Sequence, residues 1–386
     1  MRENVESFKE EVLALNDFMA RNPEIGGEEY KSSGAMVRLL TKHGIKVEYP
    51  FAGMDTAFRG VINEGKGRKA AILAEYDALR GIGHGCGHCA SGSISVLAAL
   101  VLNMIKDQIP AEIHIIGTPD EEMRGGKVTM VNNGVFDGYD FAIMIHMSNK
   151  NALYSGFLAL DAYEFSFHGK PAHAASIPWE GRNALNAARL FMDATDMMRQ
   201  HVMEDVRLHG YIKSGGDASN TVPHLAVVEM LVRAKERDYV DELSKWVIDC
   251  AQAAALATRT SYTVEQLGEK FDGMKRVTAG EKLLKKIYDD LGLPVLDLGS
   301  QTGGSSDIGN VSRICPAFHP YISIGEEYNG HTLEFAQAMT GERTHKAILD
   351  GGEIIARFVS DIYNTPFALE EMWNEFKGDQ VQGGVV

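Results

Sequence analysis

The sequence is poor in cysteine: four in 386 residues are too few for a disulfide framework. It also has no apolar run long enough to span a bilayer, since the longest, around residues 94–105, is short and interrupted. Lys and Arg number 38 against 53 Asp and Glu, and no basic patch accompanies the motifs. These absences argue against a disulfide-stapled domain, a membrane-spanning protein, and nucleic acid or an anionic membrane as partner.

What is present is the composition of a globular protein, 45% hydrophobic and 24% charged, without a low-complexity tract. A length of 386 residues predicts about two domains. Residues 1–15 are charged and predict an amphipathic helix rather than a signal peptide, so we expect a cytoplasmic protein.

Apolar periodicity predicts alternating strands and helices at both ends of the chain. Helices are expected over residues 5–20, 32–43, 91–106, 127–133 and 346–363, and another is expected from residue 280 on. Strands are expected over residues 57–62, 70–74, 112–117, 141–145, 294–298 and 321–324. This alternation predicts an α/β domain with a mostly parallel sheet and helices on both faces.

The pattern changes between residues 159 and 271. There the expected order is strand, long helix, two strands, helix and strand, over 160–168, 183–204, 211–214, 226–234, 238–258 and 262–266. This β-α-β-β-α-β order is typical of the ferredoxin-like fold, a small antiparallel sheet with two helices on one face. We therefore expect one α/β domain, residues 1–158 and 272–386, interrupted by an inserted α+β domain, residues 159–271.

Two adjacent carboxylates, Glu121 and Glu122, follow the apolar run 113–119. If that run is a strand, both lie at its carboxyl end, where open α/β sheets bind ligands. Adjacent side chains diverge there, so one carboxylate can hold a metal while the other handles a proton. His146, at the end of the next apolar run, lies one strand further along the same edge. A solvated loop is the plain alternative, but the position after a strand and before Gly125-Gly126 favours a site.

Residues 84–88, His-Gly-Cys-Gly-His, place two imidazoles and a thiol in a glycine-rich loop. Thiolate and imidazole together favour zinc, or another transition metal such as manganese, over magnesium or calcium. Cys86 and Cys89 also form a Cys-x-x-Cys pair, which can instead be a redox pair or half of a structural zinc site. Asp77 follows the strand 70–74, where it can orient a metal-bound histidine or be an ordinary strand-end acid.

Two further histidines stand in distinctive segments, His173 in Gly169–Ala175 and His331 in Gly330–Phe335. Each can equally be a surface histidine.

Taken in order, these motifs resemble the aminoacylase/glutamate carboxypeptidase family of co-catalytic metallohydrolases. Within it the likeness is to the branch of p-aminobenzoyl-glutamate hydrolases and auxin-conjugate amidohydrolases. The matching segments are 74–79, 84–88, 119–122, 146, 169–184, 219–223, 305–311 and 331–332. Together they cover nearly the whole chain, from about residue 20 to 360. The resemblance implies a zinc-peptidase-like sheet domain, an inserted lid or dimerisation domain, and a homodimer or larger homo-oligomer.

The resemblance also implies a metal site with one or two divalent ions, zinc or manganese foremost and cobalt a further candidate. The implied ligands are Cys86, His88, Glu122, His146 and His331, with Cys86 bridging.

The remaining implied roles concern catalysis and substrate binding. Glu121 would be the general base, and Asp77 would orient a ligand. His173 would reach the substrate from the lid, in its own or the partner subunit's site. Asn220 and Arg233 would contact a substrate carboxylate.

The sequence departs from the family pattern at two positions. Cys89 stands where the family usually has Asp or Asn, and Arg80 stands where it usually has proline. Cys89 can add a ligand, alter the metal preference or pack, while Arg80 would place a cation near the cleft entrance. Both departures leave the identity of the substrate undetermined, whereas the predicted fold does not depend on them.

The predicted function is metal-dependent hydrolysis of an amide bond in a small N-acyl or N-aroyl amino acid or a dipeptide. Metal-activated water would attack the amide, with Glu121 as the base. An alternative is hydrolytic deamination of an aromatic amine by the same site. A non-catalytic metal-binding scaffold is a third hypothesis, which the presence of Glu121 disfavours because a scaffold needs no base.

Overall fold

The computed structural model describes residues 1–154, 156–296 and 304–382, with side chains described to residue 378. The chain forms two compact units, Met1–Ser155 with Met274–Gln301 and Asn310–Val386, and Gly156–Gly273 with Thr302–Gly309. Each unit has a hydrophobic core of its own.

One boundary differs from the expected one, because the separate segment 304–309, expected in the first unit, groups with the inserted unit. The Leu158 N–H donates to the carbonyl of Gly304 at 3.0 Å. Gly309 lies so close to the backbone of Asp272 that a Cβ there would be 1.9 Å from the Asp272 carbonyl oxygen. These backbone contacts join segments far apart in the sequence, so local patterns did not indicate them.

The first unit alternates strands and helices along the chain. Its elements up to the inserted unit are α1 (Arg2–Arg21), α2 (Tyr30–Lys42), β1 (Lys46–Glu48), β2 (Phe58–Ile62), β3 (Lys69–Ala74), α3 (His88–Met104), η1 (Lys106–Gln108), β4 (Glu112–Gly117), α4 (Gly126–Asn132), β5 (Phe141–Ile143) and β6 (His146–Ser148). Those after it are α7 (Thr278–Asp290), α8 (Ile308–Ile314), β11 (Ala317–Phe318), β12 (Tyr321–Ser323), α9 (Leu333–Ala338), α10 (Glu342–Asn364) and α11 (Ala368–Gln382).

The main sheet has six strands in the order β1-β2-β4-β3-β5-β11. The pairs β1–β2 and β2–β4 are antiparallel, and the other three pairs are parallel. The expectation of a largely parallel sheet is thus confirmed. A second, two-stranded sheet pairs β6 with β12 in parallel. Ala74 of β3 pairs with Gly117 of β4, so the loops after these two strands leave the sheet at the same edge.

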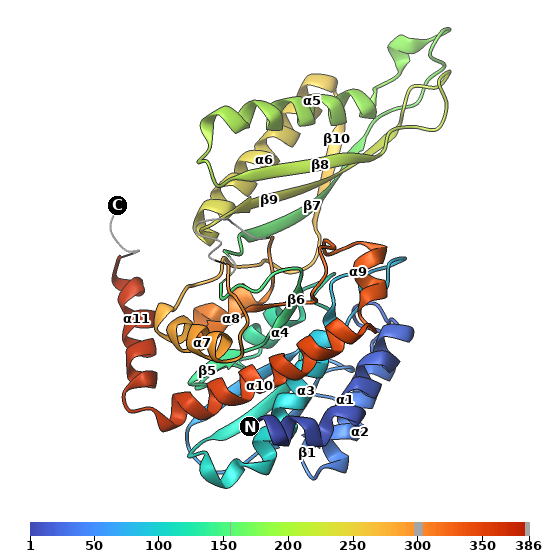
Figure 1. Cartoon of the computed structure of the whole chain (residues 1–386). Helices are drawn as coiled ribbons and strands as arrows, with labels where there is room; N and C mark the ends of the chain where they lie inside the picture. The colour runs from blue at the N-terminus through green and yellow to red at the C-terminus, as the bar shows by residue number, and fades with distance from the viewer. Residues whose placement is uncertain (155, 297–303, 383–386) are drawn as a thin grey trace. The chain divides into compact units, whose positions relative to one another are not determined.

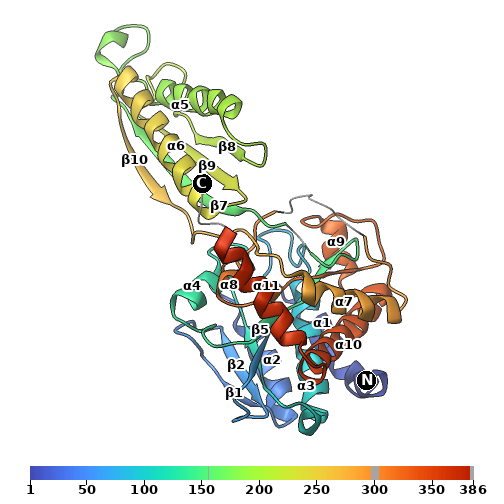
Figure 2. The same cartoon turned by 90° about the vertical axis from the view of Figure 1, so that its left-hand side faces the viewer.

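Helices cover both faces of this sheet, as expected. α1, α3 and α10 contribute to one core with β3 and β4, whereas α4 lies against the opposite face (Figures 1 and 2). α3 is buried from His88 to Leu102, and α10 packs closely on it. Gly351 of α10 makes this approach possible, since a Cβ there would lie 2.8 Å from the Ile94 side chain.

Several expected boundaries were wrong. The run 141–145 is not one strand, because β5 ends at Ile143 and β6 begins at His146. Residues 294–296 form no strand, and the rest of the strand expected over 294–298 lies outside the described residues. β1 and β11 have three and two residues, which are too few to show a periodicity in the sequence, so neither strand was predicted. α8, α9 and α11 were not predicted either.

The second unit has the order β-α-β-β-α-β that the sequence indicated. Its elements are β7 (Ala159–His168), η2 (Pro178–Glu180), α5 (Ala184–Met198), η3 (Arg199–His201), β8 (Arg207–Ser214), β9 (Leu225–Ala234), α6 (Arg237–Thr258) and β10 (Ser261–Gln266). The sheet runs β10-β7-β9-β8 with every pair antiparallel. Both helices lie on one face of it, above the alternately buried side chains of β7 and β9 (Figure 1).

The long helix expected over 183–204 ends earlier, at Met198. Residues 199–204 carry no fully buried side chain, and only the half-buried Val202 packs on the core of this unit. At its start, the Asn183 side chain accepts a hydrogen bond from the Asn186 N–H at 3.1 Å and caps the helix.

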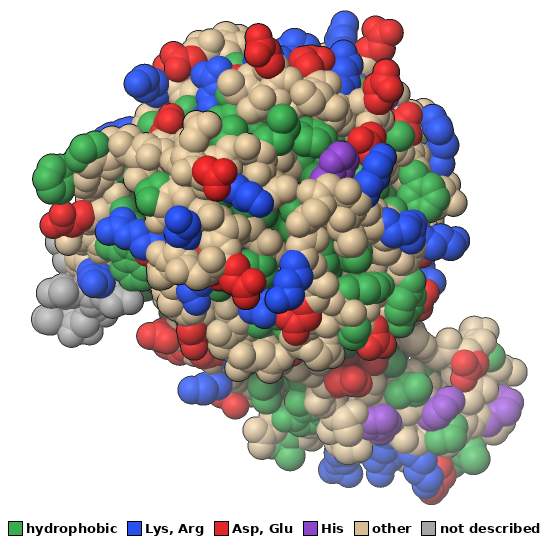
Figure 3. Space-filling model, turned by 90° about the horizontal axis from the view of Figure 1, so that it is seen from below, with side chains coloured by type: hydrophobic (Ala, Val, Ile, Leu, Met, Phe, Trp, Pro, Cys, Tyr) green, Lys and Arg blue, Asp and Glu red, His purple; other side chains and the backbone are tan. Residues whose placement is uncertain are grey.

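No helix in the described part of the chain is long and apolar enough to cross a membrane. On the face shown in Figure 3, acidic and basic side chains are interspersed rather than gathered by sign. This distribution agrees with the lack of a basic patch in the sequence.

Candidate metal-binding active site

The loop before α3 carries Cys86 and His88. Gly87, the residue before α3, has φ +85°, and a Cβ there would lie 2.7 Å from the Cβ of Met147. Glycine therefore allows both the left-handed turn and the close approach. As a result, the side chains of Cys86 and His88 reach the same site next to His146.

The loop after β4 carries Glu121 and Glu122 and is held by a buried glutamate. Glu29 accepts hydrogen bonds from the Asp120 N–H at 2.8 Å and from Thr56 Oγ1 at 2.9 Å. Asp120 itself has φ +63°, which turns the chain sharply before the two carboxylates. Burial raises the pKa of Glu29 to about 7.

Asp77 connects the two loops. One carboxylate oxygen lies 2.7 Å from His88 Nδ1, and the other accepts a hydrogen bond from the Glu122 N–H at 2.9 Å. Burial would raise the pKa of Asp77, but the charge of His88 and these hydrogen bonds lower it below its ordinary value. Asp77 thus directs His88 Nε2 away from itself, which is how a carboxylate orients a metal-bound histidine.

His146 is held as a neutral imidazole. Burial lowers its pKa to about 4. Its Nδ1 lies 2.7 Å from the Met147 carbonyl oxygen and donates to it, so Nε2 presents a lone pair 3.5 Å from Cys86 Sγ. His319, which the sequence analysis did not single out, stacks on His146 with ring centroids 5.2 Å apart.

His331 enters the site from the loop before α9. Its backbone has φ +65°, and its N–H donates to the Gly85 carbonyl at 2.8 Å. Thr332 caps α9 by accepting from the Phe335 N–H at 3.2 Å. These bonds leave His331 Nε2 3.9 Å from an oxygen of Glu122.

The structure therefore brings together six residues that the sequence singled out. Their side-chain N, O and S atoms form three overlapping groups, within each of which all atoms lie within 4.8 Å of one another. The groups are Cys86–His88–His146, Cys86–Glu122–His331 and His88–Glu121–Glu122.

The donor atoms of these groups suit a divalent transition metal. His88 Nε2 and Glu122 Oε1 are buried and have no hydrogen-bond partner among the described residues. Buried polar atoms are otherwise almost always paired, so each is available for a ligand. Thiolate, imidazole and carboxylate together are the ligands of zinc and similar ions.

A buried ion pair between Glu75 and Lys127 lies next to His88, and the sequence did not indicate either residue. Lys127 Nζ, in the first turn of α4, lies 2.5 Å from Glu75 Oε1, and both side chains are fully buried. The second oxygen of Glu75 lies 3.4 Å from His88 Nε2. Burial would raise the pKa of Glu75, but the Lys127 charge lowers it far below its ordinary value. Lys127 thus keeps a negative charge beside His88.

The other residues of these motifs are placed outside the cluster. Cys89 is fully buried in the hydrophobic core, and burial raises its pKa to about 12. Its thiol belongs to none of the donor groups found among the described residues, so Cys89 packs. His84 Nδ1 accepts a hydrogen bond from the Cys89 N–H at 3.2 Å, while Arg80 is exposed.

Three predicted substrate contacts lie in the second unit. His173 is exposed, and its Nδ1 accepts from the Ala175 and Ser176 N–H groups at 3.3 and 3.2 Å. Asn220 is also exposed and lies next to it, since its carbonyl accepts from the Ala174 N–H. Arg233, on β9, donates to Ser305 Oγ at 3.2 Å.

Comparison with known proteins decides the family. Residues 66–359 match peptidase family M20/M25/M40. The chain belongs to this family. It is 31% identical to the Xaa-Arg dipeptidase of Mus musculus, over 97% of this chain and 91% of the relative. It is also 31% identical to one of the chains of the p-aminobenzoyl-glutamate hydrolase of Escherichia coli K12, over 67% of this chain and 58% of the relative.

A solved structure shares the fold. The Bacillus subtilis protein YXEP, described as a dinuclear metal binding peptidase of the M20 family, matches with a TM-score of 0.66. The two are 17% identical, over 90% of this chain and 98% of that one. The resemblance stated from the motifs is thus confirmed, and the protein is an enzyme of the metallopeptidase and amidohydrolase family.

Proposed function

We propose that this enzyme hydrolyses the amide bond of a dipeptide or of a small N-acyl or N-aroyl amino acid, using the site around Cys86, His88 and Glu122. The observation that carries this proposal is the set of converging donor atoms, of which two, His88 Nε2 and Glu122 Oε1, are buried and form no hydrogen bond among the described residues. The mouse and Escherichia coli relatives, named for a dipeptide and an aroyl amino acid, support this substrate class.

One or two divalent ions would be held by five of the converging side chains, and zinc or manganese suits their mixture of donors. The five are Cys86, His88, Glu122, His146 and His331. When bound, such an ion polarises the amide carbonyl and makes a water more acidic.

Within this site Glu121 would carry the proton from the attacking water to the leaving amine. It lies next to His88 and Glu122 and is half-buried, so its carboxylate can reach an attacking water. Glu121 would take the proton of that water and then deliver it to the leaving amine, as general base and then general acid. Glu29 and Asp77 keep the loop in position through the N–H groups of Asp120 and Glu122.

The second unit would bind the substrate and pair two copies of the chain in a homodimer, as the family resemblance suggests. Arg233 supports a contact with a substrate carboxylate, because its Nε is buried without a hydrogen-bond partner among the described residues. His173 and Asn220 are exposed neighbours that could contact the substrate of the same or of a partner subunit.

The test is to assay the metal-loaded enzyme with Xaa-Arg dipeptides, p-aminobenzoyl-glutamate, N-acetyl amino acids and aromatic amines. We expect amide cleavage, detected as a new primary amine and a free carboxylic acid. Release of ammonia from the aromatic amines without amide cleavage would establish deamination instead.

The two glutamates are separated by a matched pair of variants. Glu121→Gln should lower kcat by at least about a hundredfold while bound metal stays near wild type, because it removes only the proton carrier. Glu122→Gln should lower the metal content, measured by plasma emission spectrometry. If Glu121→Gln loses the metal and Glu122→Gln keeps it, the assigned roles are reversed.

A further inference from the structure

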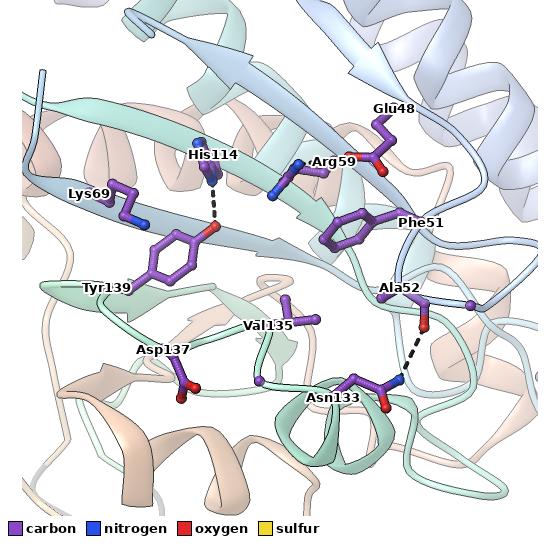
Figure 4. A pocket seen from close by; sticks show the side chains of 12 residues that line it. Glu48, Phe51, Ala52, Arg59, Lys69, His114, Asn133, Val135, Asp137 and Tyr139 are labelled. Atoms are coloured by element: carbon purple, nitrogen blue, oxygen red, sulfur yellow. Dashed lines mark hydrogen bonds and ion pairs between the residues drawn. The ribbon is translucent and has the colours of Figure 1, made fainter. Parts of the chain in front are cut away.

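A second cavity lies in the first unit at the opposite end of β3 from Asp77. It has a volume of about 640 Å³ and is lined from β2, β3 and β4 on one side and from the segment 133–139 on the other (Figure 4). It shares no lining residue with the metal-binding cluster. A cavity of this size suits a small organic molecule.

Two cations from neighbouring strands face this cavity. Arg59, on β2, lies with its guanidinium carbon 4.7 Å from the ring centre of Phe51 and forms an ion pair with Glu48 at 2.7 Å. Lys69, on β3, has its ammonium 5.3 Å from the ring centre of Tyr139. Figure 4 shows both side chains extending from the sheet toward the cavity.

Both cations have unused hydrogen-bonding capacity. The Arg59 Nε is buried and has no hydrogen-bond partner in the described part of the chain. Lys69 is half-buried, and its ammonium lies over the ring of Tyr139 without a carboxylate of the described residues within 4.0 Å. A buried donor without a partner is rare and costly, so an acceptor supplied by a ligand would stabilise this arrangement.

His114, between the two cations, stays neutral and adds no positive charge of its own. Burial lowers its pKa, the hydrogen bond and charge of Glu112 raise it, and the charges of Arg59 and Lys69 lower it, so that the pKa lies below its ordinary value. Its Nε2 lies 2.6 Å from Glu112, and its Nδ1 is bonded to the hydroxyl of Tyr139. The Glu112 carboxylate accepts a hydrogen bond from the Gly65 N–H at 2.6 Å and is also engaged by His114.

Two carboxylates also line the cavity, Glu48, which is paired with Arg59, and Asp137, while the other side chains around the cations are apolar, aromatic or amide. Phe51, Val135 and the ring of Tyr139 surround the space beside the cations, and the Asn133 side chain closes one end by donating to the Ala52 carbonyl at 3.2 Å. These surfaces suit a flat or apolar body rather than a bare ion.

We propose that this cavity binds a small organic anion, with its carboxylate or phosphate group at Arg59 and Lys69 and its body against Phe51, Val135 and Tyr139. The guanidinium Nε and the ammonium would each donate to the anionic group, and such charge-assisted bonds are the strong ones. Because this site shares no residue with the metal cluster, a ligand bound here would not lie at the metal ligands and need not be a substrate.

The test is isothermal titration calorimetry of the full chain with benzoate, phenyl phosphate, inorganic phosphate and the uncharged benzamide. We expect benzoate or phenyl phosphate to bind, inorganic phosphate to bind more weakly, and benzamide to show no binding. Whichever of benzoate and phenyl phosphate binds with the lower Kd shows whether the site prefers a carboxylate or a phosphate group. Binding of benzamide as tight as that of benzoate would overturn the proposal, as would inorganic phosphate binding as tightly as phenyl phosphate.

Variants separate this cavity from the metal site, which could itself take up carboxylates. Lys69→Met should weaken aryl-anion binding about tenfold or more, since it removes one charge-assisted bond. Val135→Trp should do the same by filling the cavity without removing a charge. Lys66→Met, at an exposed position outside the lining, is the matched control and should bind like wild type. Unchanged affinity in both Lys69→Met and Val135→Trp, or absence of binding to wild type, would refute the site.

Discussion

The paired charges of Glu75 and Lys127 show how a single residue can matter without touching a substrate. Both side chains are fully buried, and Lys127 supplies the positive charge that keeps Glu75 ionised beside His88. Removing one partner of a buried pair leaves the other charge uncompensated, which costs more than the pair contributes when intact.

Lys127→Met should therefore lower the free energy of unfolding by about 3–5 kcal/mol. Urea denaturation followed by circular dichroism measures this change. Adding Glu75→Gln should recover part of the loss, because a neutral amide needs no counter-charge. If the double variant loses the sum of the two single effects, the two side chains are not coupled.

The buried Glu29 predicts a pH dependence. Burial raises its pKa from 4.5 to about 7 in the folded protein. The folded state therefore holds the proton more tightly than the unfolded state. This contribution to stability is fully present below about pH 4.5 and is lost as the pH rises through about 7.

Relative to Glu29→Gln, the wild type should lose on the order of 3 kcal/mol of stability between pH 4.5 and pH 7.5. Urea unfolding at a series of pH values measures the difference between the two proteins. Glu28→Gln, at the exposed neighbouring position, is the control and should follow the wild-type curve. A constant difference between Glu29→Gln and wild type across this range would contradict the assigned pKa.

At the scale of elements, the packing of α3 against the end of β3 positions His88. Gly92 of α3 lies so close to β3 that a Cβ would be 2.3 Å from the Glu75 carbonyl oxygen and 2.4 Å from Met36 Cε. The first of these is a backbone atom and cannot move independently of the strand. Because Gly92 has no side chain, the start of α3, which carries His88, can pack directly against the end of β3.

Gly92→Ala should destabilise the protein by about 1–3 kcal/mol, because the helix must shift away from the strand. It should also weaken metal binding, measured by competition with a chromogenic chelator. Gly34→Ala in α2 is the matched control, since its Cβ would meet only the flexible end of Arg38 at 3.3 Å. That change should stabilise the protein slightly, as Ala usually does within a helix. Equal effects of the two changes would contradict this role of Gly92.

The sequence predicted long elements better than short ones. α1 and α6 each bury one face, and the middle of α10 is buried all round, but in all three the apolar side chains recur with the helical period and predicted the helix. The run 141–145 is apolar throughout, and nothing in it marks the break between β5 and β6.

In the candidate site, the sequence predicted the residues that lie in local motifs and missed those that are joined to the site by long-range contacts. Cys86, His88 and Glu122 lie in local motifs and could be found in the sequence. Glu29 could not, because its partner Asp120 is 91 residues away and no local pattern connects the two. Lys127 could not be predicted either, although it lies only five residues after Glu122.

At the scale of the whole molecule, the proposed metal ligands all belong to the first unit. Removing the metal with a chelator should therefore lower the stability of that unit. A ligand present at a hundred times its Kd contributes about 2.7 kcal/mol. We expect faster amide hydrogen exchange in α3 and β4 after chelation, and unchanged exchange in β7 and β9. Equal acceleration in both units would show that the metal stabilises them jointly.

The five proposed ligands are also separated along the chain in a way that affects biosynthesis. Cys86, His88, Glu122 and His146 all precede the second unit, whereas His331 follows it. A ribosome therefore exposes four of the donors well before it adds the fifth, with the whole segment Gly156–Gly273 translated in between. An ion captured by the nascent chain would be held by an incomplete set until the loop before α9 emerges. Metal availability during translation, and not only in the finished protein, would thus influence which ion the enzyme retains.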